Sequence, residues 1–302
     1  MTRTKTAAPL QGQVIASHGR SYVIELSGGA TLECATRGKR SDAACGDHVT
    51  LKQTSIDRGV IESILPRTTL LYRSDAFKQK LIAANVTQAV LVVAAVPSFY
   101  DDLINRCLAA CEHGRIAPLI VLNKIDLPQG EAAWEALAVY RALGYRVVRL
   151  SAKHDITPLA PLLHNHTSVL VGQSGMGKST IVNRLVPSAA LRVAETSAAL
   201  DSGKHTTTGA RLLHLDATSH LIDSPGLQVF GLNHIALEDT AHAFVEFRPW
   251  LHQCRFRDCT HRTEPGCAII AAAAAGHIAE SRLVTYRALI EEALRAKATR
   301  YK

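Results

Sequence analysis

The chain has 302 residues, which at roughly 150 residues per domain indicates two or three domains. Hydrophobic residues make up 47% of it and charged residues 20%, a composition that excludes a mainly disordered protein. Lys and Arg together number 34 against 26 Asp and Glu, and the net charge of +8 favours an anionic partner without identifying it. No apolar run approaches the roughly 18 residues that cross a bilayer, and Met1 to Leu10 lack the apolar stretch of a secretory signal. We therefore expect a cytoplasmic protein without a membrane partner, and we expect it to be a monomer.

Residues 1–66 are predicted to form the first domain, a small β-barrel. Gly28-Gly29 and Cys45-Gly46-Asp47 supply turns between short strand-like segments. Five short strands in fewer than sixty residues indicate a barrel of the OB or SH3 type, and such barrels bind either nucleic acid or protein. The strand-like segments include Gln13–Ala16, Ser21–Leu26, Thr31–Ala35 and His48–Gln53.

Residues 67–230 are predicted to form an α/β domain, because continuous apolar strands alternate with segments of helical spacing. The predicted strands are Ala89–Val96, Ile116–Leu122, Tyr145–Leu150 and Ser168–Val171, followed by a hairpin of Ala210–Leu215 and His220–Ile222. The predicted helices are Leu103–Glu112, Glu131–Leu143 and Lys178–Leu185. Residues 231–302 are expected to form a third, mostly helical domain with a separate core, ending in an amphipathic helix over Ile278–Lys297.

The segment Gly172–Ser179, G-Q-S-G-M-G-K-S, matches the phosphate-binding pattern G-x4-G-K-[ST] between a predicted strand and a predicted helix. Backbone N–H groups of such a loop approach phosphate oxygens, and the helix N-terminus adds positive potential. We expect Lys178 to reach the β- and γ-phosphates as a catalytic group, and Ser179 to hold Mg²⁺. The predicted nucleotide contacts in this segment are Gly172, Gln173, Ser174, Gly175, Met176, Gly177, Lys178, Ser179 and Thr180.

Two further motifs follow predicted strands. Asp223-Ser-Pro-Gly226 suits an Asp near Mg²⁺ and a Gly whose backbone N–H meets the γ-phosphate. In Asn123-Lys-Ile-Asp126, the carboxylate of Asp126 can accept the N1–H and the 2-amino group of guanine, whereas adenine offers neither donor. We expect Asn123 to brace this loop and the stem of Lys124 to cover the base plane.

The order of the motifs along the chain is unusual. Ser151, Ala152 and Lys153 form an S-A-K sequence whose backbone N–H groups can meet guanine O6. N-K-x-D and S-A-K come before the phosphate loop and D-x-x-G, whereas the standard order of guanine-nucleotide motifs starts with the phosphate loop. This order indicates a circular permutation, in which the same sheet is cut at a different place. It also puts D-x-x-G directly before the third domain, so a nucleotide-dependent movement there would act on that domain.

Three cysteines and one histidine crowd into fourteen residues: Cys254, Cys259, His261 and Cys267. Thiolates and an imidazole suit tetrahedral Zn²⁺, and four ligands without an open position predict one structural zinc per chain. A reactive or buried thiol cluster is the alternative. The neighbouring cationic and aromatic residues either contact phosphates and bases or form a solvated rim; they are Arg255, Phe256, Arg257 and Arg262. Cys107 and Cys111, four residues apart on a predicted helix, are expected to be core thiols.

Together these motifs resemble the RsgA (YjeQ) family of bacterial GTPases of small ribosomal subunit biogenesis. The resemblance spans Gln11 to about Leu294 and is carried by the order N-K-x-D, S-A-K, G-Q-S-G-x-G-K-S, K-H-T-T-T, D-S-P-G-L and C-R-F-R-D-C-T-H-x3-P-G-C. It implies an N-terminal OB barrel, a circularly permuted GTPase and a C-terminal zinc domain. It also implies docking on the small ribosomal subunit and its rRNA late in maturation, with hydrolysis of GTP to GDP and phosphate stimulated there.

The catalytic group is less obvious than the nucleotide contacts. The residue after D-x-x-G is Leu227, which lacks the amide with which a Gln orients the attacking water in Ras-like enzymes. His205, in the threonine-rich loop Gly203–Thr208, can accept or donate a hydrogen bond near neutral pH. In the family that the chain resembles, the matching His is the proposed catalyst; the alternative is an exposed loop histidine. One threonine of this loop, for which we choose Thr207, is expected to bind Mg²⁺.

Two other functions are compatible with the residues alone. A P-loop kinase for a small molecule would need an acceptor pocket and would leave the zinc domain without a role. An RNA-binding scaffold with a structural nucleotide would bind GTP or GDP without turnover.

Overall fold

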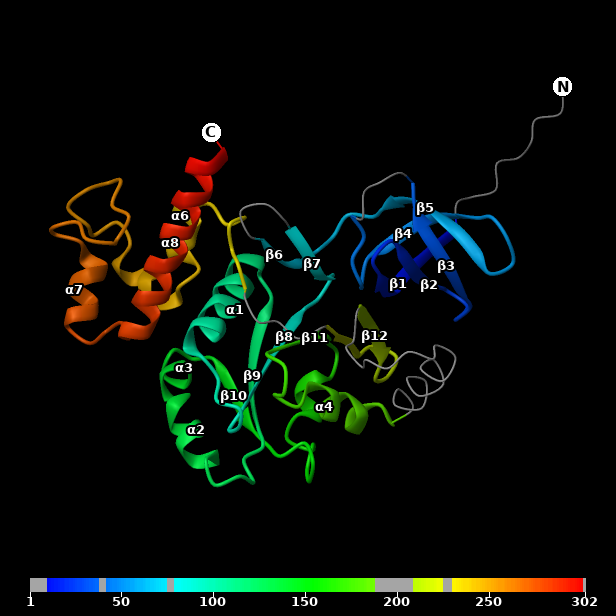
Figure 1. Ribbon diagram of the computed structural model, residues 1–302, viewed down its shortest axis with the longest axis horizontal. Coiled ribbons are helices and arrows are strands. Elements are labelled where there is room, and N and C mark those ends of the chain that lie inside the picture. Colours follow the sequence, from blue (N-terminus) through cyan, green and yellow to red (C-terminus); the bar gives the residue numbers. More distant parts are fainter. Residues whose placement is uncertain (1–9, 38–41, 75–78, 188–208, 225–229, 301–302) are drawn as a thin grey trace.

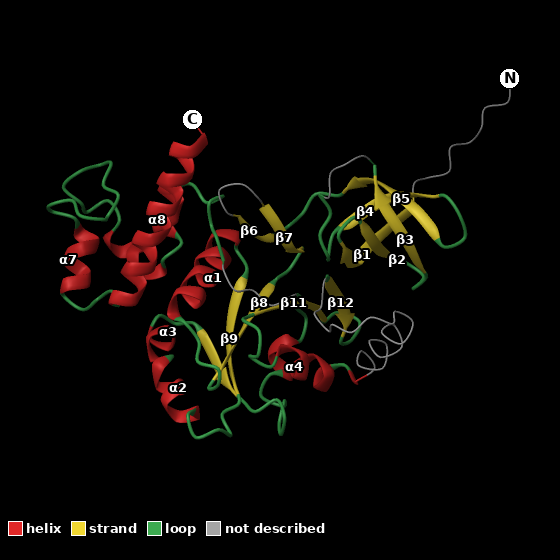
Figure 2. Ribbon diagram, viewed as in Figure 1, coloured by secondary structure: helices red, strands yellow, loops and turns green. Residues whose placement is uncertain are grey.

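The computed structural model describes residues 10–37, 42–74, 79–187, 209–224 and 230–300, and the backbone of these residues forms three regions (Figure 1). A barrel lies on one side of a central α/β region, and a group of C-terminal helices lies on the other side (Figure 2). None of the helices in these described ranges combines the length and the apolar character that crossing a bilayer requires.

The first region is a closed five-stranded barrel, as predicted. Its strands are β1 Leu10–His18, β2 Ser21–Leu26, β3 Thr31–Thr36, β4 His48–Gln53 and β5 Arg58–Ile64. They pair in the order β1-β2-β3-β5-β4, and β4 pairs back with β1 to close the barrel. Alternate side chains point inward, and Val14, Tyr22, Ile24 and Val49 are fully buried there in a core of its own. The prediction for β2 and for β4 matches the observed bounds.

The central region is a doubly wound sheet, which confirms the predicted α/β class. Its strands are β8 Gln88–Ala94, β9 Ala117–Asn123, β10 Arg146–Arg149, β11 Thr167–Val171, β12 Ala210–His214 and β13 His220–Asp223. The order is β10-β9-β8-β11-β13-β12, parallel throughout except for β12. Alternate residues of β8 enter two different cores, one under α1 Asp101–Gly114 and the other under α4 Lys178–Leu185. Helices therefore cover both faces, which is why these strands read as continuous apolar runs.

Two parts of the central region differ from the sequence prediction. The helix expected over Glu131–Leu143 is broken into α2 Gly130–Ala136 and α3 Ala138–Ala142. At the break, the backbone N–H of Leu137 bonds the carbonyl oxygen of Trp134, three residues earlier, at 3.1 Å, and the Arg141 guanidinium donates to the same oxygen at 2.7 Å. A hairpin that was not predicted, β6 Leu70–Ser74 and β7 Gln79–Ala84, leads from the barrel into β8.

The C-terminal region contains α6 Leu237–His242, the 3₁₀ helix Val245–Trp250, α7 Ala268–Ala274 and α8 Glu280–Arg300. The prediction that this region has a separate core is wrong, because Phe244, Phe247, Ile269 and Tyr286 belong to the same hydrophobic cluster as β8 and α1. The last helix is also less amphipathic than predicted. Its buried face includes the polar Arg282, whose guanidinium forms an ion pair with the Glu246 carboxylate of the 3₁₀ helix.

The barrel and the central sheet are continuous. Strand β1 pairs antiparallel with β12 and joins the two into one sheet of eleven strands. Nothing in the hydrophobic pattern of either strand predicts this pairing, because an edge-to-edge contact uses backbone groups rather than side chains.

Candidate functional site

The predicted nucleotide motifs lie at one edge of the sheet. N-K-x-D follows β9, S-A-K follows β10, the phosphate loop follows β11 and D-x-x-G follows β13. All four strands are parallel, so their carboxyl ends meet at the same edge, which is where open α/β sheets bind ligands.

Asn123 holds three of these loops together. Its side chain is buried, and Nδ2 donates a hydrogen bond of 2.9 Å to the carbonyl oxygen of Met176 in the phosphate loop. Its Oδ1 accepts a 2.9 Å hydrogen bond from the backbone N–H of Ala152 in S-A-K. Gly177 lies directly against it, since a Cβ at Gly177 would be 2.2 Å from Nδ2 of Asn123. A glycine is therefore required for this close approach, and the expectation that Asn123 braces the site describes the contacts that the structure contains.

The phosphate loop is packed against the sheet and opens toward α4. A Cβ at Gly172 would be 2.3 Å from the carbonyl oxygen of Val92 on β8. Helix α4 begins after Gly177 without a side-chain cap, so its first N–H groups are directed at the position that a phosphate would take. Four residues of the loop and helix start are exposed to solvent: Ser174, Gly175, Ser179 and Thr180.

Lys178 is buried and points back into the loop. Its Nζ donates hydrogen bonds to the carbonyl oxygens of Gly172 at 2.7 Å and Gln173 at 2.8 Å. Burial lowers the pKa of this ammonium, and the Asp223 carboxylate opposes that shift. An ammonium has three protons to donate, so these two bonds leave one for a phosphate oxygen.

Asp223 ends β13 on the other side of the phosphate loop and is half-buried. Burial raises the pKa of its carboxyl group, and the neighbouring Lys178 lowers it in part. The next residue, Ser224, is fixed by a 2.6 Å hydrogen bond from its hydroxyl to the carbonyl oxygen of Leu170. A carboxylate that lacks full solvation is available to a divalent cation that binds together with phosphate.

Asp126 and Lys124 lie at the end of the site where a base would bind. A hydrogen bond from Ser151 is the main cause that holds the pKa of Asp126 below its ordinary value, so the carboxylate is an acceptor throughout the physiological range. The Lys124 ammonium donates to the carbonyl oxygens of Val96 and Gly175, at 2.7 Å each. Ser151 is buried, whereas Lys153 is exposed.

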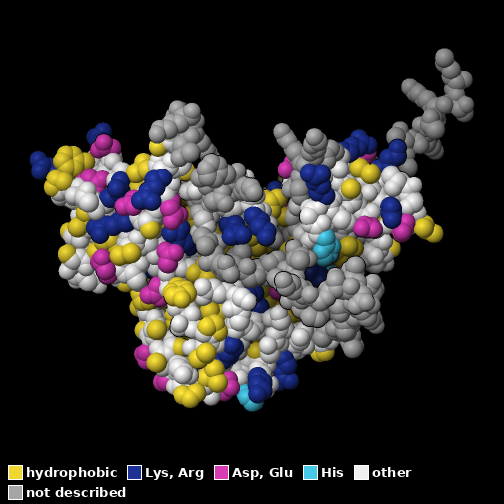
Figure 3. Space-filling model, viewed as in Figure 1, with side chains coloured by type: hydrophobic (Ala, Val, Ile, Leu, Met, Phe, Trp, Pro, Cys, Tyr) yellow, Lys and Arg dark blue, Asp and Glu magenta, His cyan; other side chains and the backbone are white. Residues whose placement is uncertain are grey.

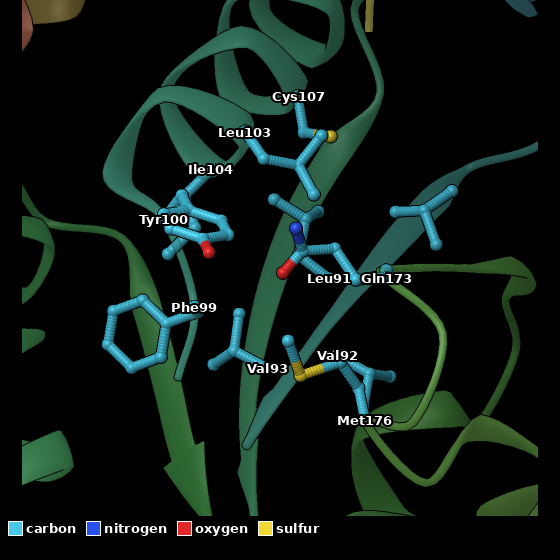
Figure 4. Close-up of a pocket in the computed structure, with 12 residues that line it drawn as sticks. Leu91, Val92, Val93, Phe99, Tyr100, Leu103, Ile104, Cys107, Gln173 and Met176 are labelled. Atoms are coloured by element: carbon cyan, nitrogen blue, oxygen red, sulfur yellow. The ribbon is translucent and has the colours of Figure 1, made fainter. Parts of the chain in front are cut away.

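A narrow apolar cleft lies beside the phosphate loop, between β8 and the start of α1 (Figure 4). Phe99, Tyr100, Gln173 and Met176 line it, together with Cys107 and aliphatic side chains of β8 and α1. Burial raises the pKa of the Cys107 thiol well above its ordinary value, as expected for an inert core thiol. Four residues that were singled out from the sequence lie outside the described residues: His205, Thr207, Gly226 and Leu227.

The predicted metal ligands come together in the C-terminal region. One ligand atom from each of Cys254, Cys259, His261 and Cys267 lies within 4.8 Å of the others. The Sγ atoms of Cys254 and Cys267 are 3.8 Å apart, and each is 3.4 Å from Nδ1 of His261. Ligands about 2.3 Å from a tetrahedral zinc have sulfur atoms about 3.8 Å apart, so the four residues fit the ion.

The loop that carries these ligands contains one organising residue that the sequence analysis missed. The Glu264 carboxylate accepts hydrogen bonds from the backbone N–H groups of Thr260, Arg262 and Thr263. Its position between the third ligand and the Pro-Gly turn was the only available signal. The adjacent Arg255, Phe256 and Arg257 are exposed, whereas Arg262 is half-buried near the Glu291 carboxylate.

Comparisons with known proteins agree with this arrangement. The family model described as RsgA GTPase matches residues 64–233. The chain is 50% identical over 286 residues to the small ribosomal subunit biogenesis GTPase RsgA of Nitrosospira multiformis, which covers 94% of this chain and 91% of that protein. It is 52% identical to the RsgA protein of Burkholderia pseudomallei strain 1710b, over 94% of this chain and 92% of that one.

Two solved structures resemble the whole chain. YjeQ from Thermotoga maritima superposes with a TM-score of 0.71 at 30% identity, covering 95% of this chain and 99% of that one. YloQ, whose structure is described as that of a circularly permuted GTPase, superposes with a TM-score of 0.67 at 26% identity and covers 98% of each chain.

Proposed function

The chain belongs to the RsgA GTPase family, and from this premise we propose that it hydrolyses GTP while acting in the late maturation of the small ribosomal subunit. The matched relatives carry that activity and that subunit in their names. Turnover stimulated by the subunit is part of the proposal.

The observation that carries the GTPase part is the joining of three loops through Asn123. Its two hydrogen bonds fix N-K-x-D against both the phosphate loop and S-A-K. The base-binding and phosphate-binding ends of the site therefore have a set separation. Such preorganisation supports binding of a whole guanine nucleotide rather than of a phosphate alone.

In the proposed complex, the carboxylate of Asp126 accepts the N1–H and 2-amino hydrogens of guanine, and the backbone of Ser151, Ala152 and Lys153 lies at O6. The nine residues of the phosphate loop and helix start surround the phosphates. Lys178 uses its third proton on a phosphate oxygen and stabilises the charge that develops in the transition state.

Mg²⁺ bound with GTP would supply further charge neutralisation at the phosphates. We propose that Ser179 and Thr207 provide its protein ligands and that Asp223 lies close behind them, where burial leaves its carboxylate short of solvent. Gly226 donates its backbone N–H to the γ-phosphate. His205 orients the attacking water, since Leu227 has no group to do so.

The zinc loop and the barrel are the proposed contacts with rRNA. A structural Zn²⁺ held by Cys254, Cys259, His261 and Cys267 fixes a loop that exposes Arg255, Phe256 and Arg257. Figure 3 shows Lys and Arg side chains on the face where the C-terminal region and the barrel are both visible. Exposed cations and an aromatic ring suit phosphate contacts and base stacking.

The experiment is a turnover assay with purified small ribosomal subunits. We expect slow release of phosphate from GTP by the protein alone and a large increase when subunits are added. The same assay on His205→Ala should lose most of the stimulated rate while GTP affinity stays close to wild type.

Other outcomes separate the alternatives. Phosphate transfer to a small-molecule acceptor would indicate a kinase. Tight nucleotide binding without turnover, with or without subunits, would indicate an RNA-binding scaffold.

A further inference from the structure

The hairpin of β12 and β13 places the barrel one strand away from Asp223. Within this hairpin, Arg211 pairs with Asp223. On its other side, Arg211 pairs with Ala16 of β1 in the barrel. A single row of backbone partners therefore runs from the barrel through Arg211 to the carboxylate at the edge of the nucleotide site.

The contact between β1 and the start of β12 is close. A Cβ at Gly209 would be 2.0 Å from the carbonyl oxygen of Ser17. Ser17 also pairs with Ala210, so the first residues of β12 have no space to shift relative to the barrel. At the far end of the hairpin, Nε2 of His214 lies 2.8 Å from a carboxylate oxygen of Glu25 on β2.

A second contact comes from the turn Cys45–Gly46 of the barrel. The backbone of Gly46 has φ +94°, and a Cβ there would be 2.2 Å from the carbonyl oxygen of Ala84 and 3.3 Å from Cδ1 of Ile222. Ile222 is the residue before Asp223, and it is fully buried. The turn is also bonded to the central region, because the backbone N–H of Ala84 donates 2.8 Å to the carbonyl oxygen of Cys45.

The side chain of Cys45 fills the space between the barrel and the β12–β13 hairpin. It is fully buried and lies in the hydrophobic cluster of the central region rather than in the barrel core. Its thiol contacts the carbonyl oxygen of Ile15 on β1 at 3.6 Å, next to the backbone of Leu212 on β12. The turn thus touches β1, β12 and β13 at once, where a dense interior transmits small displacements.

We propose that the Cys45–Gly46 turn of the barrel is a positioning element for GTP hydrolysis: it fixes the end of β13 and so sets where the Asp223 carboxylate meets the metal–nucleotide complex. The turn does not touch the nucleotide. It acts through Ile222 and the β12–β13 hairpin, and the inference rests on the GTPase function proposed above. Because coupling between binding equilibria is reciprocal, nucleotide binding also changes how tightly β1 is held on β12.

Two glycines allow a matched test with substitutions. Gly46→Ala adds a methyl group against Ala84 and strains a backbone with φ +94°. Gly29→Ala imposes a similar strain at φ +79° in the same barrel, but nothing lies within 4 Å of the added Cβ.

We expect Gly46→Ala to lower kcat about tenfold to a hundredfold, as displacements near 1 Å do. The Mg²⁺ concentration for half-maximal rate should rise, and GDP affinity should stay within about twofold because Asn123 and Asp126 are unaffected. Gly29→Ala should match wild type in all three. A folded Gly46→Ala protein with wild-type kcat and Mg²⁺ dependence would overturn the proposal.

A measurement on the unmodified chain covers the case in which Gly46→Ala fails to fold. Amide hydrogen exchange is followed with and without saturating GDP and Mg²⁺, and calorimetry on the same sample establishes that GDP is bound. Exchange in β1 around Ala16 and Ser17 should slow several-fold on binding, whereas exchange in β3 and β5, on the far side of the barrel, should not change. Bound GDP with unchanged exchange in β1 would overturn the positioning role. Absence of GDP binding would instead contradict the proposed function itself.

Discussion

The N-terminal barrel keeps its hydrophobic core separate from the central sheet, whereas the C-terminal region shares one core with it. The barrel is attached by backbone pairing of β1 with β12 and by one tight turn. The C-terminal region is attached by the shared core and by polar contacts with α1, above all the paired hydrogen bonds from Arg106 of α1 to the Glu292 carboxylate of α8. Apart from Cys45, separating the barrel from the sheet would break backbone hydrogen bonds rather than open a core, whereas separating the C-terminal region would open the shared core.

This difference assigns different roles to the two flanking regions. The barrel keeps its own core, so we expect a change at the nucleotide site to reach it only through the β1–β12 pairing and the Cys45–Gly46 turn. The C-terminal helices form a rigid extension of α1, since Asn105 of α1 donates to the carbonyl oxygen of Ser281 and to the hydroxyl of Thr285 on α8. Substitutions on the two sides should therefore differ in whether destabilisation stays local or spreads to the central region.

Loss of a zinc ligand should give the largest effect. Structural zinc contributes on the order of 10 kcal/mol to small metal-dependent folds. Cys267 is buried in the shared core, so Cys267→Ser should abolish zinc binding and destabilise the central region as well as the zinc loop. Elemental analysis should find one zinc per wild-type chain and none in the variant. A variant whose central region unfolds at the wild-type denaturant concentration would mean that the two regions are independent.

Removal of the buried Arg282 guanidinium should give the second-largest loss of stability. Arg282 is fully buried, and Arg282→Met would leave the Glu246 carboxylate buried without its partner, at a cost of about 3–5 kcal/mol. Arg295→Met is the control, because Arg295 is 80% exposed beside Glu291 and should change the free energy of unfolding by less than about 0.5 kcal/mol. Urea unfolding measures both. Equal effects of the two substitutions would show that the buried pair does not anchor α8.

The ion pair between Arg67 and Asp47 at the barrel should contribute less to stability than the pair of Arg282 with Glu246. Arg67 bonds the fully buried Asp47 carboxylate at 2.7 Å, but it is partly exposed and Asp47 keeps a second donor in the backbone N–H of Ala44. Arg67→Met should therefore cost about 1–3 kcal/mol. The loss should appear in amide exchange of the barrel and of its junction at Ala84, and not in α8. Arg37→Met, at an exposed pair with Glu62, is the control. Faster exchange in α8 would contradict a local attachment.

The smallest effects are expected from removing one buried methyl group in each of the two flanking regions. Ile24 of the barrel and Ile269 of the C-terminal region are both fully buried. Replacing either by Val removes one methyl group and should cost about 0.5–1.5 kcal/mol. Ile24→Val should speed amide exchange in the barrel alone, whereas Ile269→Val should speed it in α1 as well. Identical exchange patterns in the two variants would remove the distinction between a separate and a shared core.

The sequence predicted the parts of this molecule that depend on local patterns. The bounds of β2, β4 and α4 were correct, because alternation, turn glycines and the phosphate loop mark them directly. The four residues of the Cys₃His cluster were grouped correctly from their spacing. The hydrogen bonds of Asn123 also followed from the motif, since its amide has both a donor and an acceptor to offer.

What the sequence did not predict is long-range. The pairing of β1 with β12 joins residues about two hundred positions apart through backbone groups that every residue has. The shared core under α1 was missed because an apolar side chain does not indicate which region it packs against. The burial of Arg282 was not predicted either, because a buried guanidinium depends on its tertiary contact with the Glu246 carboxylate.

The guanine site is the central claim, and titration calorimetry of the wild-type chain with GDP and with ADP tests it most directly. In the proposed site the Asp126 carboxylate would accept two hydrogens that guanine has and adenine lacks, so we expect GDP to bind at least about a hundredfold more tightly than ADP. Asp126→Asn should weaken GDP and favour xanthosine diphosphate, because an amide can donate to the additional carbonyl of xanthine. Equal affinities of the wild type for GDP and ADP would contradict the assignment of N-K-x-D as the base-recognition loop.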